Sequence, residues 1–373
     1  MATQMDYTKK TLKELQQLCK EKGVKGYSGK KREEVLALLT PSVTPSVTPS
    51  VTLAPPPSNK LKMIDLFAGT GAFSLAFEGT GKVEVVFAND MVQHSKTIYN
   101  ANFKSHTLTL QDLNDVKVED IPSHDILTGG FPCQPFSIAG LQEGFNDERS
   151  NVFWKILAII DKHQPRCVIL ENVKNLVSHD DKKTFATIKE NLEKRGYHIR
   201  YKVLNTAEIT GIPQHRERIY IVCLKSKEVF DKFTLDFPAI EKQAVGAMLE
   251  DAVPQKYYYT ESSSTWPLLQ EAVKKPNTIY QYRRVYVREN KSNECPTLTA
   301  NMGGGGHNVP IVLASKGIRK LTPRECFNFQ GFPESYVLPA TMSDTNLYKL
   351  AGNAVSVPVV RLIAQRLIPL LTE

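Results

Sequence analysis

The chain has 373 residues, which is longer than a single hydrophobic core usually grows, so we expect one large domain with smaller parts. Hydrophobic residues make up 41% and charged residues 23%, which is ordinary for a soluble globular protein and excludes general disorder. The 47 basic and 39 acidic side chains give a formal charge of +8, which favours a polyanionic partner such as nucleic acid, although many basic proteins bind none.

A short helical unit is predicted at residues 1–40. Thr11 and Glu14 have the spacing of a capping box, apolar residues recur at helical spacing from Leu12 to Leu18, and a second helix follows a turn at 23–29. The unit resembles a SAP-type DNA-binding module. The alternative is a small helical hairpin that contacts protein or only tethers the chain.

Residues 41–60 are predicted to be a linker, because three PSVT repeats and three consecutive prolines bury almost nothing and favour an extended chain.

From Leu61 onward, strand and helix patterns alternate. The predicted strands are 62–67, 83–89, 125–128, 167–171, 201–204 and 218–224, and the predicted helices include 152–163 and 182–195. Such alternation predicts an α/β fold, with a Rossmann-like, mostly parallel sheet, helices on both faces, and ligands at the carboxyl ends of the strands.

Three parts are expected after the linker. The catalytic domain is predicted at 61–225, and a smaller irregular lobe, rich in turn residues, aromatics and basic groups, at 226–317. Residues 318–373 are predicted to return to the main domain and to end in a long, largely apolar helix over 347–371.

Three consecutive strand ends carry residues suited to a nucleoside. The glycines of Asp65–Gly71 allow a ligand to approach the backbone, although this loop alone could be an ordinary turn. Asp90 could bind ribose hydroxyls, and Asp112 with Leu113 could receive an adenine. No GK[ST] phosphate loop is present, which argues against a nucleoside triphosphate.

Cys133 is the candidate nucleophile. An isolated cysteine is more often a core residue, but this one follows the fourth strand in a loop stiffened by Pro132 and Pro135. Cys167 and Cys223 lie within predicted strands and are assigned to the core.

A carboxylate and two arginines are expected in the same cleft. Glu171 ends the fifth strand, where it could alternatively cap a helix. Arg216 and Arg218, two residues apart, point to one side of an extended chain and suit a base carbonyl, a phosphate or a carboxylate. His215 between them should face away, as a structural residue.

The motifs DLFAGTGAF, GGFPCQPFS, ENV, QHRER, TPRECFNFQGFP and GNAVSVPVV, in this order over Leu61–Leu371, resemble those of DNA (cytosine-5)-methyltransferases. The resemblance implies the class I S-adenosylmethionine-dependent methyltransferase fold, S-adenosyl-L-methionine as cofactor, double-stranded DNA as partner, and a target-recognition role for the lobe at 226–317. Two departures are that Gln111 stands where glycine is common and Asp90 where glutamate is common.

Residue roles follow from the resemblance. Cys133 would attack the cytosine, Glu171 would contact a ring nitrogen, and Arg216 with Arg218 would steady the base. The cofactor would contact Phe67, Ala68, Gly69, Thr70, Gly71, Asp90, Met91, Asp112, Leu113, Pro132, Asn353, Ala354 and Val355. DNA would contact Gln134, Ser137, Gln214, Arg283, Arg284, Thr297, Leu298, Thr299 and Asn301.

The predicted reaction is methyl transfer to carbon 5 of a flipped-out cytosine through a covalent cysteine adduct. Two alternatives stay open, namely cytosine-5 methylation of a structured RNA such as tRNA, and a catalytically silent DNA-binding protein. The separate lobe and the SAP-like unit favour DNA, and the complete set of chemical residues favours an enzyme.

Several absences are also expected. The six cysteines form no CxxC pair and no Cys/His cluster at zinc-finger spacing, so no metal is predicted. No run approaches 18 apolar residues and no signal peptide is evident, so we expect no membrane partner. We expect an intracellular monomer with reduced thiols, in the cytoplasm or nucleoid, or in a nucleus, depending on the host.

Overall fold

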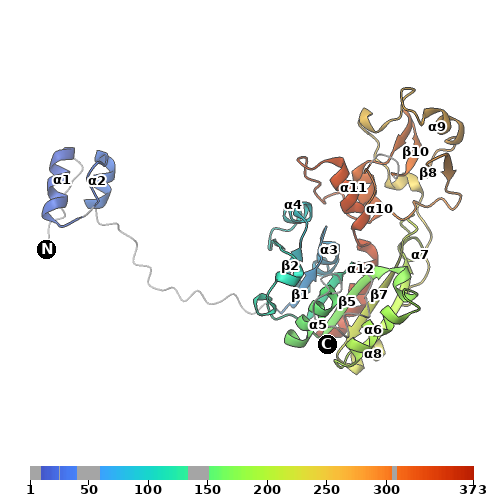
Figure 1. Cartoon of the computed structure of the whole chain (residues 1–373), viewed down its shortest axis with the longest axis horizontal. Helices are drawn as coiled ribbons and strands as arrows, with labels where there is room; N and C mark the ends of the chain where they lie inside the picture. The colour runs from blue at the N-terminus through green and yellow to red at the C-terminus, as the bar shows by residue number, and fades with distance from the viewer. Residues whose placement is uncertain (1–9, 25, 40–58, 133–150, 305–308) are drawn as a thin grey trace. The chain divides into compact units, whose positions relative to one another are not determined.

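The computed structural model describes residues 10–24, 26–39, 59–132, 151–304 and 309–373. The chain divides into two compact units, Met1–Ser58 and Asn59–Glu373, which are each described by themselves (Figure 1).

The smaller unit contains two helices, α1 (Leu12–Glu21) and α2 (Arg32–Leu39). The predicted capping box is confirmed, because the Thr11 hydroxyl accepts a hydrogen bond from the Glu14 amide and the Thr11 amide donates to the Glu14 carboxylate at 2.7 Å. Its buried core consists of Leu15, Cys19, Val35 and Leu39. So small a core gives only marginal stability.

The larger unit is built on a seven-stranded sheet in the order β3-β2-β1-β4-β5-β7-β6. Its strands are β1 (Leu61–Leu66), β2 (Val83–Asp90), β3 (Leu108–Leu110), β4 (Ile126–Gly130), β5 (Cys167–Val173), β6 (His198–Asn205) and β7 (Glu217–Leu224). All neighbours pair in parallel except β7, which is antiparallel to both β5 and β6. The predicted mostly parallel sheet is therefore confirmed.

Helices cover both faces of this sheet. They are α3 (Ala72–Glu78), α4 (Gln93–Asn102), α5 (Asn151–His163), α6 (Lys183–Glu193), α7 (Thr206–Thr210), α8 (Lys227–Lys232) and α12 (Val357–Thr372). A further helix, α11 (Asp344–Asn353), packs against α4. Met63 of β1 belongs to the core cluster that includes α3 and α12, whereas its neighbour Ile64 belongs to the cluster that includes α5 and α6. The alternation of side chains along a strand thus buries β1 on both sides.

The predicted single helix over 347–371 is instead two helices, α11 and α12, separated at Ala354–Ser356. Pro358 explains the break, because a proline disfavours helical backbone before it and suits the first turn of a new helix. The stretch Asp344–Thr372 has the length and composition to cross a membrane, but 56% of its apolar window is buried within the protein, as in a core helix.

A second, four-stranded antiparallel sheet lies in the part of the chain predicted to be an irregular lobe. Its order is β11-β10-β8-β9, from β8 (Tyr280–Arg283), β9 (Tyr286–Glu289), β10 (Ile311–Ala314) and β11 (Gly317–Lys320), and it packs on α9 (Trp266–Ala272). The sequence missed this sheet because each strand is only four residues long, and the predicted lobe boundary after residue 317 falls inside β11.

A buried ion pair joins this second sheet to helix α10 (Pro323–Phe329). Arg319 of β11 donates two hydrogen bonds, of 2.7 and 2.6 Å, to the carboxylate of Glu325. The Thr322 amide donates to the same carboxylate at 2.8 Å and completes a capping box. The TPREC motif is therefore an anchor between the lobe and the main domain.

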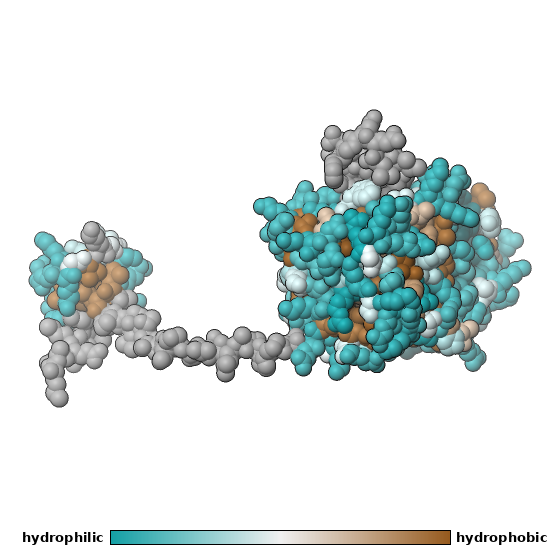
Figure 2. Space-filling view, turned by 90° about the horizontal axis from the view of Figure 1, so that it is seen from below, coloured by the Kyte–Doolittle hydropathy of each residue, from teal (hydrophilic) through white to brown (hydrophobic). Residues whose placement is uncertain are grey.

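The face of the larger unit seen in Figure 2 is mostly hydrophilic, with apolar residues in small scattered areas. The apolar residues of this unit gather instead in its buried clusters.

Candidate active site

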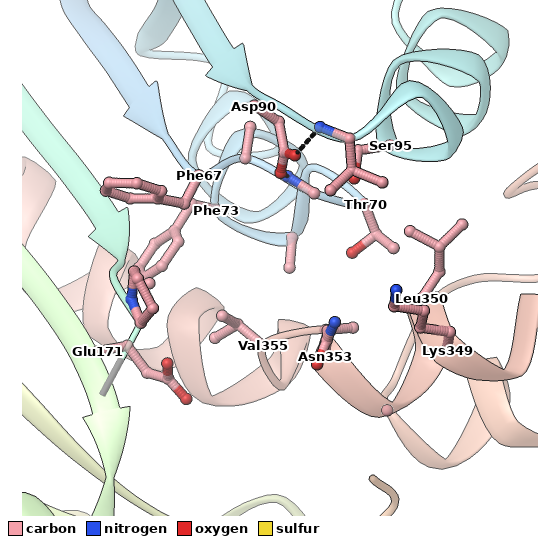
Figure 3. A pocket seen from close by; sticks show the side chains of 18 of the residues that line it. Phe67, Thr70, Phe73, Asp90, Ser95, Glu171, Lys349, Leu350, Asn353 and Val355 are labelled. Atoms are coloured by element: carbon pink, nitrogen blue, oxygen red, sulfur yellow. Dashed lines mark hydrogen bonds between the residues drawn. The ribbon is translucent and has the colours of Figure 1, made fainter. Parts of the chain in front are cut away.

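A cavity of about 390 Å³ lies at the carboxyl ends of β1, β2, β4 and β5. Its walls come from the loop after β1, the end of β2, the residues after β4, the end of β5, and the region between α11 and α12 (Figure 3). Every predicted cofactor residue lines it except Gly71, Asp112 and Leu113. Ligand binding at this edge of the sheet was the sequence-based prediction.

The loop after β1 is shaped to meet a ligand with its backbone. Phe67 and Gly69 have positive φ values of 55° and 53°, the left-handed region that suits glycine and is uncommon for phenylalanine. The Gly69 amide donates to Asp90 Oδ2 at 2.9 Å, and the Val92 amide donates to Asp90 Oδ1 at 2.8 Å, the bond drawn in Figure 3. The carboxylate is therefore fixed from both sides at the rim of the cavity.

Beneath the loop, the fully buried Asp65 connects three elements. It accepts hydrogen bonds from the Ser74 hydroxyl of α3 at 2.6 Å and from the Thr128 hydroxyl of β4 at 3.0 Å. Burial raises the pKa of Asp65 to about 6, against the opposing effect of these hydrogen bonds. Asp65 supports the loop and does not line the cavity.

Three predicted cofactor residues lie elsewhere. A Cβ on Gly71 would lie 2.4 Å from the ring of Phe103, so this glycine serves close packing. Asp112 accepts a hydrogen bond from the Asn114 amide at 2.9 Å as the cap of a short 3-10 turn, and Leu113 is buried in the core. None of these three residues therefore lines the cavity.

Glu171 lies at the opposite end of the cavity from Asp90 (Figure 3). The side chain is only 7% exposed, and a Cβ on Gly130 would lie 3.4 Å from Oε2, so a larger residue there would crowd the carboxyl. Burial raises the pKa of Glu171, although the charges of Arg218 and Arg216 oppose the rise. Within the described residues Oε1 has no hydrogen-bond partner, so the carboxyl is not used as a helix cap.

Arg218 reaches Glu171 because β7 runs antiparallel to β5. The register pairs Arg218 with Val173 and Tyr220 with Glu171, so the start of β7 lies beside the end of β5. Arg218 Nε lies 3.3 Å from Glu171 Oε1.

Arg216, two residues earlier, is only 2% exposed and its guanidinium binds backbone. It donates to the carbonyls of Leu298 at 3.0 Å, Gly352 at 3.3 Å and Ala354 at 2.7 Å. Burial lowers the pKa of Arg216 to about 9, an effect to which the nearby charge of Arg218 adds and which Glu171 opposes. Arg216 thus ties β7, the lobe and the cavity wall together.

Gln214 and Leu298, both predicted to contact DNA, are buried in the same seam. The Gln214 amide nitrogen donates to the carbonyl of Phe329 at 2.6 Å, and Gln330 donates to the carbonyl of Ala351 at 2.7 Å. A side chain in the position of Gln214 or Leu298 is not available to DNA. We define the buried seam as Gln214, Arg216, Leu298, Gln330 and Gly352.

A second, polar cavity of about 640 Å³ lies on the lobe side of the seam. Of the predicted DNA-binding residues, Arg283, Thr297 and Thr299 line it, and Arg284 and Asn301 do not. His215 also lines it, half exposed, with Nδ1 3.4 Å from Glu294, so it faces away from the first cavity, as predicted. We call this cavity the recognition groove. Cys133, Gln134 and Ser137 lie outside the described residues.

The sequence-based prediction missed part of the first cavity. Asn346 of α11 also lines it. So do Lys349 and Leu350 of the same helix, and Phe73 and Ser95 (Figure 3). The three-and-four spacing on α11, just before the GNAV motif, is the signal that could have identified them.

The donor set of the first cavity fits a nucleoside sulfonium. Phe67, Phe73 and the exposed Met91 give flat and apolar surfaces for an adenine, and Asp90 offers a fixed carboxylate to ribose hydroxyls. Together with the parallel sheet, this cavity defines a class I S-adenosylmethionine-dependent methyltransferase.

Comparison with known proteins identifies the family. The model of C-5 cytosine-specific DNA methylases matches residues 61–369, and the chain belongs to this family. It is a DNA (cytosine-5)-methyltransferase that uses S-adenosylmethionine.

Curated relatives are Type II methyltransferases. M.Bsp6I of Bacillus sp. (strain RFL6) is 50% identical over 82% of this chain and 98% of the relative. M.HhaI of Haemophilus parahaemolyticus is 34% identical over 82% of this chain and 93% of the relative. The S. pombe Dnmt2 methyltransferase has a similar fold, with a TM-score of 0.65 and 22% identity over 83% of this chain and 99% of that chain. Residues 1–60 lie outside the family match.

The buried seam gives a direct prediction at Gly352. A Cβ there would lie 2.1 Å from the carbonyl of Thr299, a backbone group that cannot rotate away. We expect Gly352→Ala to lower the free energy of unfolding by about 2–3 kcal/mol and to weaken methyl transfer, measured by denaturant titration and by labelled-methyl incorporation. Gly304→Ala, where the nearest atom is at an ordinary 3.6 Å, is the matched control. Equal stability of the two variants would contradict the close contact.

Proposed function

We propose that this enzyme methylates carbon 5 of a cytosine extruded from a short duplex DNA site, with Cys133 as the covalent nucleophile. The observation that carries the proposal is the meeting of Pro132, the residue before Cys133, with Glu171 and Arg218 in the wall of one cavity. Because its relatives are named Type II methyltransferases, we also propose that it belongs to a restriction–modification system.

Cytosine carbon 5 is a poor nucleophile until a thiolate adds to carbon 6. In our proposal the Cys133 thiolate forms this bond, and the enamine-like carbon 5 would then take the methyl group as the bond between that methyl group and the sulfonium sulfur breaks, which leaves S-adenosylhomocysteine. A water molecule would accept the carbon 5 proton, and the thiolate would leave as the ring double bond forms again. Bound S-adenosylmethionine supplies the electrophilic methyl group. Phe67, Asp90 and Asn353 would hold the cofactor from three sides of the cavity.

Glu171 is proposed to hold a proton at ring nitrogen 3 while the thiolate adds. The raised pKa of its carboxyl keeps the acid form present at higher pH than for an exposed glutamate, and its Oε1 is not engaged in a hydrogen bond within the described residues. A proton donor in this position would offset the negative charge that develops on the ring.

Arg218, rather than Arg216, is proposed to contact the base. Both arginines line the cavity, but Arg216 already donates to three carbonyls, and Arg218 lies beside Glu171. The cavity is a hollow in the protein, and the target carbon belongs to a base that is stacked inside a duplex. The cytosine would therefore have to be flipped out of the duplex to enter the cavity.

We expect Cys133→Ala to abolish methyl transfer to duplex DNA while leaving DNA binding measurable, because only the sulfur is needed for the covalent step. Labelled-methyl incorporation and fluorescence anisotropy would measure the two properties. Cys19→Ala, in the smaller unit, is the control and should retain transfer. Transfer by Cys133→Ala would refute the nucleophile, and wild-type label in total tRNA but not in DNA would refute the substrate.

We expect Glu171→Gln to lower kcat by about 10²–10⁴-fold with little change in DNA affinity. The pKa of Glu171 is raised, and its acid form is present at low pH and is lost as pH rises through that pKa. The pH profile of the wild-type rate should therefore include a decrease as pH rises through the pKa of Glu171. The variant should lack this component but keep the rise due to thiol ionisation. Glu217→Gln, whose carboxylate pairs with Lys174 at 2.8 Å, is the control on the neighbouring strand β7. Identical pH profiles for wild type and Glu171→Gln would contradict the role.

The helical unit at the amino terminus is proposed to add DNA affinity without taking part in catalysis. It lies outside the family match, folds around its own core, and exposes lysines that include Lys13, Lys20 and Lys31. Such charges release counterions on binding DNA.

We expect removal of residues 1–58 to weaken DNA binding and flatten its salt dependence, with kcat unchanged. A full-length chain with Lys13, Lys20 and Lys31 changed to Gln should reproduce the loss if charge is the cause. An unchanged salt slope in the truncated chain would count against DNA binding by this unit.

A further inference from the structure

The loop after β1 contains three residues in the left-handed region of backbone conformation. Phe67, Gly69 and Gly71 have φ values of 55°, 53° and 72°. Glycine adopts this region at little cost, but phenylalanine does so rarely, so the loop keeps its shape only where its surroundings hold it. The first cavity is lined from this loop by Phe67, Ala68, Gly69 and Thr70 (Figure 3). The contacts that hold the loop therefore decide the shape of this cavity wall.

The first half of the loop is held by β2. The Ala68 amide donates to the carbonyl of Asn89 at 2.9 Å. The Gly69 amide donates to the Asp90 carboxylate, also at 2.9 Å. Both acceptors lie at the end of β2, so these bonds fix the peptides of the loop that come before Thr70.

The peptide between Thr70 and Gly71 is held by a side chain from a distant part of the sequence. Tyr336 lies in the segment between α10 and α11, and its hydroxyl donates to the carbonyl of Thr70 at 2.7 Å in a buried position. The Gly71 amide of the same peptide donates to the carbonyl of Ala68 at 2.6 Å. Both polar groups of this peptide are therefore paired, and the orientation of its plane is fixed.

This peptide is one that could otherwise turn over. A peptide that precedes a glycine can rotate with little steric cost, because glycine accepts both positive and negative φ. A buried carbonyl that has lost its donor costs free energy, which favours any arrangement that turns the carbonyl toward water. The Tyr336 hydroxyl opposes this rotation because it pairs the Thr70 carbonyl in one orientation only.

Tyr336 itself is held in place on several sides. Its ring centroid lies 4.5 Å from that of Phe332 and 5.7 Å from that of Phe327, and the residue is only 2% exposed. Its carbonyl accepts a hydrogen bond from Arg324 at 2.6 Å. Burial raises the pKa of the Tyr336 phenol, so the hydroxyl keeps its proton at neutral pH and remains a donor.

The residue after Tyr336 joins the same segment to α4. The Asn102 side chain donates to the carbonyl of Val337 at 2.9 Å and accepts a hydrogen bond from the Val337 amide at 2.7 Å. Helix α4 also carries Ser95 of the cavity wall. The segment 333–337 thus contacts two elements of the cavity wall, and none of its residues is among the described residues that line the cavity.

We infer that Tyr336 is a positioning residue for the cofactor: its hydroxyl holds the Thr70 carbonyl and so keeps the loop after β1 in the shape that binds S-adenosylmethionine. The inference rests on the proposed binding of the cofactor in this cavity, and it adds a residue that lies behind the cavity wall. Without the hydroxyl the loop populates other shapes, and the apparent Kd rises as the competent fraction falls. Bound cofactor selects the competent shape, so the rate of methyl transfer at saturation is retained.

The experiment uses the full chain and S-adenosylhomocysteine, which the enzyme does not consume. Tyr336→Phe keeps the aromatic ring and removes only the hydroxyl. Calorimetry should show a Kd for S-adenosylhomocysteine that is raised about 3–10-fold. The KM for S-adenosylmethionine should rise by a similar factor, while kcat and the KM for DNA are retained. A lowered kcat with an unchanged Kd would contradict the positioning role.

Tyr197→Phe is the matched control. Tyr197 is also 2% exposed, and its hydroxyl donates to the carbonyl of Pro165 at 2.7 Å. Pro165 precedes β5 and therefore lies at the opposite edge of the sheet from the cavity. Each variant loses one buried hydrogen bond, so both should lower the melting temperature to a similar extent. Only Tyr336→Phe should weaken cofactor binding.

Hydrogen exchange reports on the loop itself. In the cofactor-free chain, the amides of residues 68–71 should exchange faster in Tyr336→Phe than in wild type or in Tyr197→Phe. Saturating S-adenosylhomocysteine should restore their protection, because it selects the competent shape. Equal exchange in the three cofactor-free proteins would show that the hydroxyl does not hold the loop.

Two failures can be told apart. Asp90→Ala removes the carboxylate that the proposed function assigns to the cofactor. If this variant binds S-adenosylhomocysteine like wild type, the cofactor does not bind as proposed and the inference falls with it. If Asp90→Ala weakens binding but Tyr336→Phe binds like Tyr197→Phe, the inference alone is overturned.

Discussion

The buried guanidinium of Arg216 is the constraint on which the active site depends. A buried charge costs several kcal/mol unless it is well hydrogen-bonded, and here its partners are the carbonyls of Leu298, Gly352 and Ala354. These carbonyls belong to the lobe and to the cavity wall, so the charge is stabilised only when both segments lie against β7. The requirement for glycine at 352 follows, because any side chain would separate them.

Burial also affects the ionisation of the Glu171 carboxyl. Desolvation raises the pKa of its carboxyl even though two arginines oppose the rise, so its acid form persists to higher pH than that of an exposed carboxyl. Arg216 also lines the cavity, and its charge opposes the rise less than that of Arg218 does. The guanidinium of Arg216 binds backbone carbonyls of the seam. Arg218, with Nε 3.3 Å from Glu171 Oε1, is therefore the cation that pairs with Glu171. Arg216 is thus bound to the backbone, whereas Arg218 pairs with Glu171 in the wall of the cavity.

Much of this site could be predicted from sequence, because βα units place strand ends at one edge. Phe67, Asp90 and Glu171 were predicted at the cavity and line it. Gln214 and Leu298 were not predicted to be buried, because their neighbours come from residues more than eighty positions away. The antiparallel direction of β7 was missed for a similar reason, since a strand pattern does not specify its direction. The four-residue strands of the lobe give too weak a periodicity to detect.

The segment from Gln214 to Arg218, which leads into β7, contributes side chains to both cavities. Side chains alternate along an extended chain, so Gln214, Arg216 and Arg218 face the seam and the active cavity, and His215 faces the recognition groove. A shift of this segment by one residue would exchange these faces, and His215 would then be buried in place of Arg216. The bridge between Gln214 and Cys295 and the hydrogen bond from the Thr297 hydroxyl to the His215 carbonyl at 2.6 Å fix the register. The lobe thus helps to set the position of Arg216 and Arg218 in the wall of the active cavity.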